Sequence, residues 1–210
     1  MMGMSRQKNQ IRGRVRLSPE VRQKQIVQTA HRILVEEGYA QLSYSKIAKL
    51  CEIRLSTVQY HFPDRSMLIG AVMKQLLDEL LERYVARTST ANAGPGERVE
   101  AMVRILADDI DNHDIASLFF ELWAFSLRDP VMAEAMDSLY VQVRTHLAGL
   151  IVEAVPGIAR DDALRRAIMI MAMADGLTVA MSHGARPPES VSEKGRDAIV
   201  TRLVRLALEG

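Results

Sequence analysis

Cysteine and aromatic residues are scarce in this chain of 210 residues, and both shortages limit what it can be. A single cysteine allows no internal disulfide and no zinc site built on cysteine pairs, which indicates a reducing compartment. Aromatic residues make up 5% of the chain, whereas methionine occurs 12 times, so the core is expected to be aliphatic and adaptable.

Long apolar runs are absent too. No stretch of about 18 apolar residues occurs, so a membrane span is not expected. The sequence before Ile26 is polar and basic, which argues against a signal peptide. We therefore expect a cytoplasmic protein without a membrane partner.

The residue patterns of common catalytic sites are also missing. The five histidines are scattered, without a pair at i,i+4, and the chain lacks Gly-rich phosphate loops, nucleophile elbows and Cys/His ligand clusters. His113 and Asp114 fall at an expected helix boundary, where a solvated cap is the simpler interpretation. Cys51 is interpreted as a small buried residue rather than a redox sensor. The sequence thus predicts no enzyme, no cofactor and no metal site.

Charge is distributed unevenly along the chain. Residues 1–65 contain 12 Lys and Arg against 5 Asp and Glu, whereas residues 66–210 contain 15 against 21. A basic head on an acidic body favours a polyanionic partner at the head. Residues 1–17, with Arg12, Arg14 and Arg16, are expected to form a flexible basic arm that contacts phosphates or a minor groove. The alternative is a solvated tail that serves only solubility.

Hydrophobic periodicity predicts an all-α protein. Ser18-Pro19-Glu20 is typical of a helix start and Gly38 of a helix end, so the first helix is expected over 19–37. Ser43 is expected to cap the second helix, Ser56 to open the third, and Asp64 to cap a long fourth helix over 65–87. Its buried side is predicted to include Met67, Leu68, Ala71, Leu77, Leu80, Leu81 and Tyr84. Further helices are predicted over 97–112, 114–128, 130–155, 160–183 and 191–208.

Residues 42–65 are interpreted as two short helices joined by a tight turn within a domain spanning 18–65. Once the inward-facing anchors such as Ile47, Ile53, Val58 and Phe62 are set aside, side chains suited to phosphates and base edges remain. Gln can bind adenine bidentately, Thr can contact a thymine methyl, and helix starts favour phosphate. The predicted contacts with double-stranded DNA are Ser43, Tyr44, Ser45, Arg54, Leu55, Ser56, Thr57, Gln59, Tyr60, His61 and Arg65.

The span from Ile26 to Leu68 resembles the N-terminal domain of TetR-family transcriptional repressors. The matching residues are Gly38-Tyr39, Ser43, Ile47-Ala48, Ile53, Ser56-Thr57-Val58, Tyr60-His61-Phe62-Pro63, Arg65 and Leu68. The chain departs from the family at Cys51-Glu52, usually Ala-Gly, at Arg54 and Leu55, often Ser and Lys, and at Ser56, often Gly. The missing Gly predicts a different turn backbone, and Leu55 is expected to alter base preference.

The resemblance implies that residues 66–210 form a helical bundle that encloses a small-molecule pocket and forms a dimer. Residues 114–128 are apolar nearly all round, which predicts a helix in the middle of the bundle. For any one aromatic residue there, plain core packing is the alternative to a ligand contact. The expected pocket residues are Met102, Leu106, Phe119, Phe120, Trp123, Tyr140, Met173 and Asp175.

Asp175 lies in an otherwise apolar stretch, and a buried carboxylate needs a partner or a shifted pKa. It could face a cationic ligand or an Arg, or lie at an exposed rim or a dimer seam. Ala172, Gly176 and Ala180 form a smooth stripe, and with Ile199, Leu203 and Leu206 they are predicted to build a four-helix dimer interface like that of the family. Trp123, Arg128-Asp129-Pro130 and Asp175-Gly176-Leu177 are similar to the subgroup containing the choline-responsive repressor of betaine synthesis.

These observations together predict a ligand-responsive transcriptional regulator. Two copies of the third helix would bind a palindromic operator, and an unidentified small molecule would release the homodimeric repressor from it. The alternative is a helical protein–protein adaptor that kept the fold without specific DNA binding.

Overall fold

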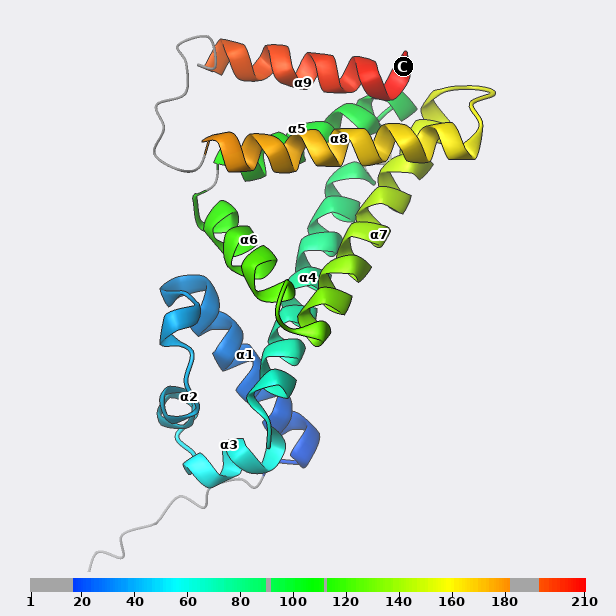
Figure 1. Cartoon of the computed structure of the whole chain (residues 1–210). Helices are drawn as coiled ribbons and strands as arrows, with labels where there is room; N and C mark the ends of the chain where they lie inside the picture. Colours follow the sequence, from blue (N-terminus) through cyan, green and yellow to red (C-terminus); the bar gives the residue numbers. More distant parts are fainter. Residues whose placement is uncertain (1–16, 90–91, 112, 182–192) are drawn as a thin grey trace, which may run out of the picture.

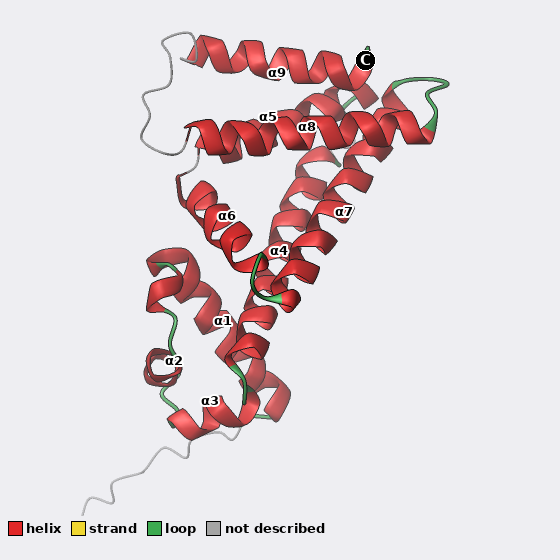
Figure 2. Cartoon of the chain, viewed as in Figure 1, coloured by secondary structure: helices red, strands yellow, loops and turns green. Residues whose placement is uncertain are grey.

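The computed structural model describes residues 17–89, 92–111, 113–181 and 193–210, and every regular element within these ranges is helical (Figures 1 and 2). The predicted all-α class is therefore confirmed. No helix in the described part of the chain is long and apolar enough to cross a membrane.

Three helices and one helical turn form the N-terminal end of the molecule: α1 (Pro19–Glu37), η1 (Tyr39–Gln41), α2 (Tyr44–Leu50) and α3 (Leu55–His61). The hydroxyl of Ser18 accepts from the Val21 N–H at 3.3 Å, and that of Ser43 accepts from the Lys46 N–H at 3.3 Å, so both predicted caps are confirmed. Gly38 ends α1 with φ 82°, as predicted. The third helix begins one residue before the predicted Ser56.

The long helix α4 (Arg65–Thr88) runs from the N-terminal end into the body (Figure 1). Asp64 caps it by accepting a hydrogen bond from the Ser66 N–H at 3.0 Å, as predicted. Leu68, Leu77 and Tyr84 lie on its buried side, but Met67 is 55% exposed, so its predicted burial is wrong. The start of α4 packs on α1 through the face that carries Leu68, and Met67 lies about 100° around the helix from that face.

The body consists of α5 (Pro95–Asp111), α6 (His113–Ser126), α7 (Pro130–Ala154), α8 (Arg160–Met181) and α9 (Glu193–Leu208). These bounds agree with the predicted helices to within two residues; the predicted ends at Asn112, His183 and Val191 lie outside the described residues. In Figure 1, α8 and α9 lie side by side at the end of the molecule opposite α3, and α4 and α7 run together between the two ends.

Helix α6 does not lie in the middle of the bundle, contrary to its predicted place. Leu122 is buried, but Phe119 and Trp123 are only partly buried and Leu127, just beyond the helix, is 86% exposed. The helix packs mainly on α7, and its side toward α1 and α4 lines cavities that it shares with those helices. The apolar side chains that α6 does not pack on α7 line these cavities. A helix can therefore be apolar all round without lying in the middle of the bundle.

Candidate DNA-binding surface and ligand cavity

Helix α3 is anchored on one side and open on the other. Val58 is 0% and Phe62 2% exposed, and both pack into a core shared with α1. The opposite side carries Gln59 and Tyr60, of which Tyr60 is 78% exposed. This exposed aromatic side chain is accessible to a partner, and its hydroxyl can donate to a phosphate oxygen.

The other predicted contact residues of this region differ in how far they are exposed. Ser45, Arg54, Leu55 and Ser56 are exposed, whereas Thr57 and His61 are half-buried at the edges of α3. The ring of His61 packs edge-on against that of Tyr60, with centroids 5.3 Å apart. Ser45, Arg54, Leu55 and Ser56 are thus accessible to a partner, as Gln59 and Tyr60 are. The basic arm with Arg12, Arg14 and Arg16 lies outside the described residues.

Three of the predicted contact residues also hold the fold together. The Tyr44 hydroxyl donates to the Phe62 carbonyl oxygen at 2.6 Å and so ties α2 to the end of α3. Burial raises the pKa of this hydroxyl, which stays protonated. The Arg65 guanidinium donates to the Leu42 carbonyl at 3.1 Å and stacks over the Tyr39 ring at 5.3 Å. Because the side chains of Tyr44, Arg65 and Ser43 are already bonded within the chain, their main role is structural. They hold α2, α3 and α4 in place relative to one another.

The turn between α2 and α3 contains a residue in the left-handed conformation. Glu52 has φ 54°, a region that glycine adopts without strain. The following Ile53 N–H donates to the Ala48 carbonyl at 2.9 Å, which closes the turn. Glu52 therefore adopts the left-handed conformation at the position where the family usually has glycine. Because Glu carries a side chain, its backbone is strained there. Cys51 is buried and its thiol donates to the Thr29 hydroxyl at 3.2 Å, as expected for a small core residue.

A cavity of about 50 Å³ lies at the centre of the body, and we call it the core cavity. It is bounded by α4, α5, α6, α7 and α8. Five of the predicted pocket residues line it: Leu106, Phe119, Trp123, Tyr140 and Asp175. These residues come from four successive helices, α5 to α8, and the fold brings them together.

The remaining three predicted pocket residues do not line the core cavity. Met102 is fully buried in the packing of α5, and Phe120 packs edge-on against the Trp123 ring with centroids 5.5 Å apart. Met173 is 43% exposed on the outer face of α8. Since Met173 and Asp175 are two residues apart, they lie about 200° apart around the helix and cannot face the same cavity.

A hydrogen-bonded chain crosses the core cavity. The Trp123 indole N–H donates to the Tyr140 hydroxyl oxygen at 2.9 Å, and the Tyr140 hydroxyl donates to Asp175 at 3.0 Å. Burial raises the pKa of the Asp175 carboxyl, and burial together with the Asp175 charge raises the pKa of Tyr140. Asp175 forms no ion pair with any described cation. Among the described residues, the Tyr140 hydroxyl is therefore the hydrogen-bond partner of the Asp175 carboxyl.

Sequence reasoning missed a second polar group at the core cavity. Asp109 accepts hydrogen bonds from Arg83 at 2.6 Å and from the Tyr84 hydroxyl at 2.7 Å. Burial raises the pKa of Tyr84 further than any nearby charge does. Asp109 stands in the acidic run Ala107–Asp111, a pattern typical of a solvated face, so no signal marked it. Tyr84 was predicted to be buried but was not linked to a site.

The outer face of α8 is apolar and exposed. Ala172, Gly176 and Ala180 lie on it, together with Met173 and Val179, which are 43% and 51% exposed. A Cβ added at Gly176 would meet no atom within 4 Å. On α9, Ile199 and Leu206 are half-buried beside this face.

Leu203 is not part of that exposed surface, contrary to its predicted place in a dimer seam. It is 3% exposed and packs in the core of the chain itself. Val200, Leu203 and Ala207 form the i, i+3, i+7 stripe that turns inward on α9.

Comparison with known proteins agrees with this architecture. Residues 95–208 match the family model for the C-terminal part of BetI-type transcriptional repressors. The regulator BetI of Burkholderia cenocepacia is 24% identical over 159 residues, which are 75% of this chain and 80% of that protein. BetI of Rhizobium meliloti is 28% identical over 169 residues, 80% of this chain and 81% of that protein.

A transcriptional regulator from Saccharomonospora viridis, solved in complex with choline, has the same fold. It superposes with a TM-score of 0.67 at 21% identity and covers 88% of this chain and 94% of that one. A helix-turn-helix end on a helical body defines the class of TetR-type transcriptional regulators. Since the family model covers more than half of the chain, the chain belongs to the BetI-type repressors of that class. It is accordingly a DNA-binding transcriptional regulator rather than an enzyme, as its sequence predicted.

Proposed function

We propose that the protein is a cytoplasmic homodimeric repressor that binds a pseudo-palindromic operator and leaves it when a small organic cation enters the core cavity. Residues 18–65 are the DNA-binding domain, and residues 66–210 bind the ligand and the second protomer. The observation that carries the proposal is α3, whose buried side is locked by Val58 and Phe62 while Tyr60 stands 78% exposed.

Helix α3 has the dimensions and the side chains needed for a major groove. The groove of B-DNA is about 12 Å wide and admits one α-helix. Gln59 is the residue suited to bidentate binding of an adenine, and Leu55 suits an apolar contact with a thymine methyl. Tyr60, Ser56 and Ser45 are exposed hydroxyl groups suited to phosphate oxygens. The base contacts then determine the operator sequence, and the phosphate contacts determine the register.

The exposed apolar face of α8 supports dimerisation. A palindromic operator requires two α3 helices about 34–36 Å apart, or a multiple of that distance, which a second protomer provides. We expect Gly176→Glu to leave the protomer folded, because its side chain points into open space, and to give a monomer by sedimentation. The matched control is Gly149→Glu, which replaces another glycine whose added Cβ meets nothing within 4 Å and should remain dimeric. A dimeric Gly176→Glu variant would overturn the α8 interface.

The core cavity suits a small organic cation such as the choline bound by the related regulator. Asp175 supplies an uncompensated carboxylate, and the Trp123 ring beside it favours cations at its face. The cavity volume of about 50 Å³ is well below the roughly 300–1,000 Å³ of ligand pockets. A ligand must therefore bind better to a conformer in which the surrounding helices have moved apart.

Helix α4 provides a physical connection between that cavity and the DNA. Leu80 and Tyr84 of α4 line the core cavity, and the same helix begins at Arg65 next to α3. Widening the cavity would displace α4 and change the spacing of the two α3 helices. Moving the population from mostly bound to mostly released needs a preference of about 5 kcal/mol for the wider conformer.

The DNA-binding part is tested by gel shift on the promoter region next to the gene, over a salt series. A specific repressor gives one tight, salt-dependent complex at a pseudo-palindromic site. Equal weak binding to all sequences would overturn the proposal and favour a helical adaptor.

A further inference from the structure

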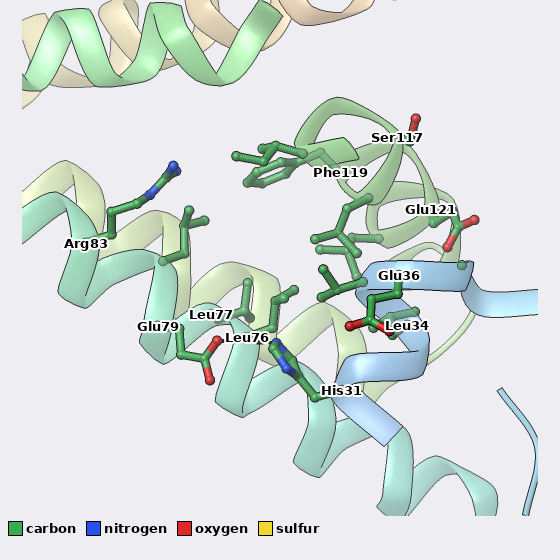
Figure 3. Close-up of a pocket in the computed structure, with 16 residues that line it drawn as sticks. His31, Leu34, Glu36, Leu76, Leu77, Glu79, Arg83, Ser117, Phe119 and Glu121 are labelled. Carbon is green, nitrogen blue, oxygen red and sulfur yellow. Dashed lines mark ion pairs between the residues drawn. The ribbon is translucent and has the colours of Figure 1, made fainter. Parts of the chain in front are cut away.

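A second cavity lies between the N-terminal end and the body, and we call it the junction cavity (Figure 3). Its volume is about 430 Å³, within the range of small-molecule sites. Its walls come from α1, α4 and α6. Leu80, Ile115 and Phe119 line both cavities, so these side chains separate the junction cavity from the core cavity.

The walls of the junction cavity are largely apolar. Six of the sixteen lining residues are leucines, which come from all three helices, and Phe119 reaches in from α6 (Figure 3). Such walls accept a hydrocarbon or aromatic body and exclude a fully hydrated ion. The lining of the junction cavity therefore suits an organic molecule better than an inorganic ion.

Each of the three helices also contributes one carboxylate to the lining: Glu36 from α1, Glu79 from α4 and Glu121 from α6. Glu36 and Glu121 form no ion pair with any residue that the structure describes; Glu121 accepts only the Tyr39 backbone N–H at 3.3 Å.

The cationic side chains of the lining do not balance these carboxylates. Arg83 is engaged by Asp109, which lies outside the junction cavity, at 2.6 Å. The buried Nε2 of His31 has no hydrogen-bond partner and lies 3.3 Å from Oε2 of Glu79. The lining thus has an excess of carboxylates, because Glu36 and Glu121 have no cationic partner among the described residues.

We propose that the junction cavity is a second ligand site, distinct from the core cavity, that binds an organic cation with an apolar body. The ammonium group lies at the acidic rim of the cavity, to which Glu36, Glu79 and Glu121 contribute from different sides, and the apolar body packs against Phe119 and the leucine side chains. Helix α1 belongs to the DNA-binding end and α6 to the body, so an occupant of the junction cavity contacts both parts. It therefore stabilises one orientation of the DNA-binding end relative to the body.

The test uses two probes that share a ring and differ in charge. Tryptamine is the cation and indolepropionate is its anionic counterpart, and both are titrated into the full-length protein by calorimetry. Tryptamine should bind with a Kd below about 1 mM, a modest affinity for a ligand of this size, and indolepropionate should not bind measurably. Equal binding of both probes, or none of tryptamine, would overturn the proposal.

Variants locate the binding site. Glu36→Gln and Glu121→Gln should each weaken tryptamine by about two- to fivefold, the range expected for partly exposed ion pairs. Glu82→Gln, an exposed carboxylate elsewhere on α4, should have no effect. Val35→Trp should block the cavity, because Val35 lines it and is 48% exposed, while Val21→Trp on the same helix is the control for folding.

Asp175→Asn separates the junction cavity from the core cavity. The proposal predicts that tryptamine binds this variant as it binds the wild type. If tryptamine binding is lost in Asp175→Asn but retained in Val35→Trp, the cation occupies the core cavity and the junction site is wrong.

Discussion

At the α3 end of the molecule, Gln59 and Tyr60 are exposed above a dense apolar core, whereas in the body Tyr140 and Asp175 are enclosed between helices and bonded to each other. Removing a polar group at the first end leaves the packing beneath it unchanged. Removing one in the body changes the network that spans three helices. DNA recognition and fold stability are therefore separable at α3, while ligand binding, stability and conformation are coupled in the body.

The largest effect expected at the α3 end comes from its anchor. Phe62→Ala should lower the free energy of unfolding by about 3–5 kcal/mol, because it empties a fully packed site beneath the helix. Tyr60→Ala, an aromatic side chain two residues away, should change it by less than about 0.5 kcal/mol. Urea unfolding of both variants measures the contrast. Similar losses in the two would mean that the exposed side of α3 also holds the fold.

Operator affinity should show the opposite pattern. Gln59→Ala and Tyr60→Ala should each weaken specific operator binding by about 1–3 kcal/mol while the dimer persists. Gln59→Ala should also relax the preference at one base pair, and Tyr60→Ala should weaken related sequences equally. Fluorescence anisotropy with the operator and with point-mutated operators distinguishes the two. Wild-type affinity in both variants would show that another helix binds the groove.

In the body, Asp175 should affect how the free energy of unfolding depends on pH. Its pKa is raised in the folded protein by burial, so its ionisation disfavours the folded state. This cost is absent below the unfolded pKa near 3.9, grows as pH rises, and is fully present above the folded pKa. Asp175→Asn should therefore raise stability near neutral pH and reduce its decline with rising pH.

Unfolding in urea between about pH 4 and 7 measures this difference in stability. Asp137→Asn, at an exposed position on α7, is the matched control and should leave the pH profile unchanged. Identical pH profiles for the wild type and Asp175→Asn would contradict the buried carboxylate.

The smallest expected effect concerns the turn before α3. Glu52→Gly should raise the free energy of unfolding by about 0.5 kcal/mol. Relief of the left-handed backbone at φ 54° favours the variant, and the greater freedom of glycine in the unfolded chain offsets part of that gain. Glu82→Gly, in the interior of α4, should instead lower stability by about 1 kcal/mol. A loss of stability in Glu52→Gly would show that the Glu side chain supports the turn.

The helices could be predicted from the sequence because their signals are local. Ser18, Ser43 and Asp64 each cap the helix that follows, and a cap is recognised from the few residues around it. The anchors Val58 and Phe62 also followed from periodicity within one short helix. Once these anchors were set aside, the remaining side chains and the family resemblance together predicted the contact surface.

The face that a helix turns toward its neighbours was harder to predict. Met173 and Leu203 were each assigned to the wrong side of their helices, because α8 is apolar on both sides and α9 has further apolar residues, such as Ile199 and Leu206, beside its buried stripe. Which side is buried depends on where α5 and α7 pass, and the sequence of α8 or α9 alone does not specify those positions. The junction cavity could not be predicted for the same reason, since its walls come from α1, α4 and α6.

The central claim is that a cation in the core cavity changes the fit of α3 to DNA, and operator affinity with and without choline tests it most directly. Anisotropy titrations should show at least a tenfold loss of affinity in the wild type at saturating choline, about 1.4 kcal/mol. Asp175→Asn should lose this response while binding the operator normally. Quenching of Trp123 fluorescence reports whether choline is bound. Choline binding that leaves operator affinity unchanged, or an equal loss in Asp175→Asn, would contradict the account.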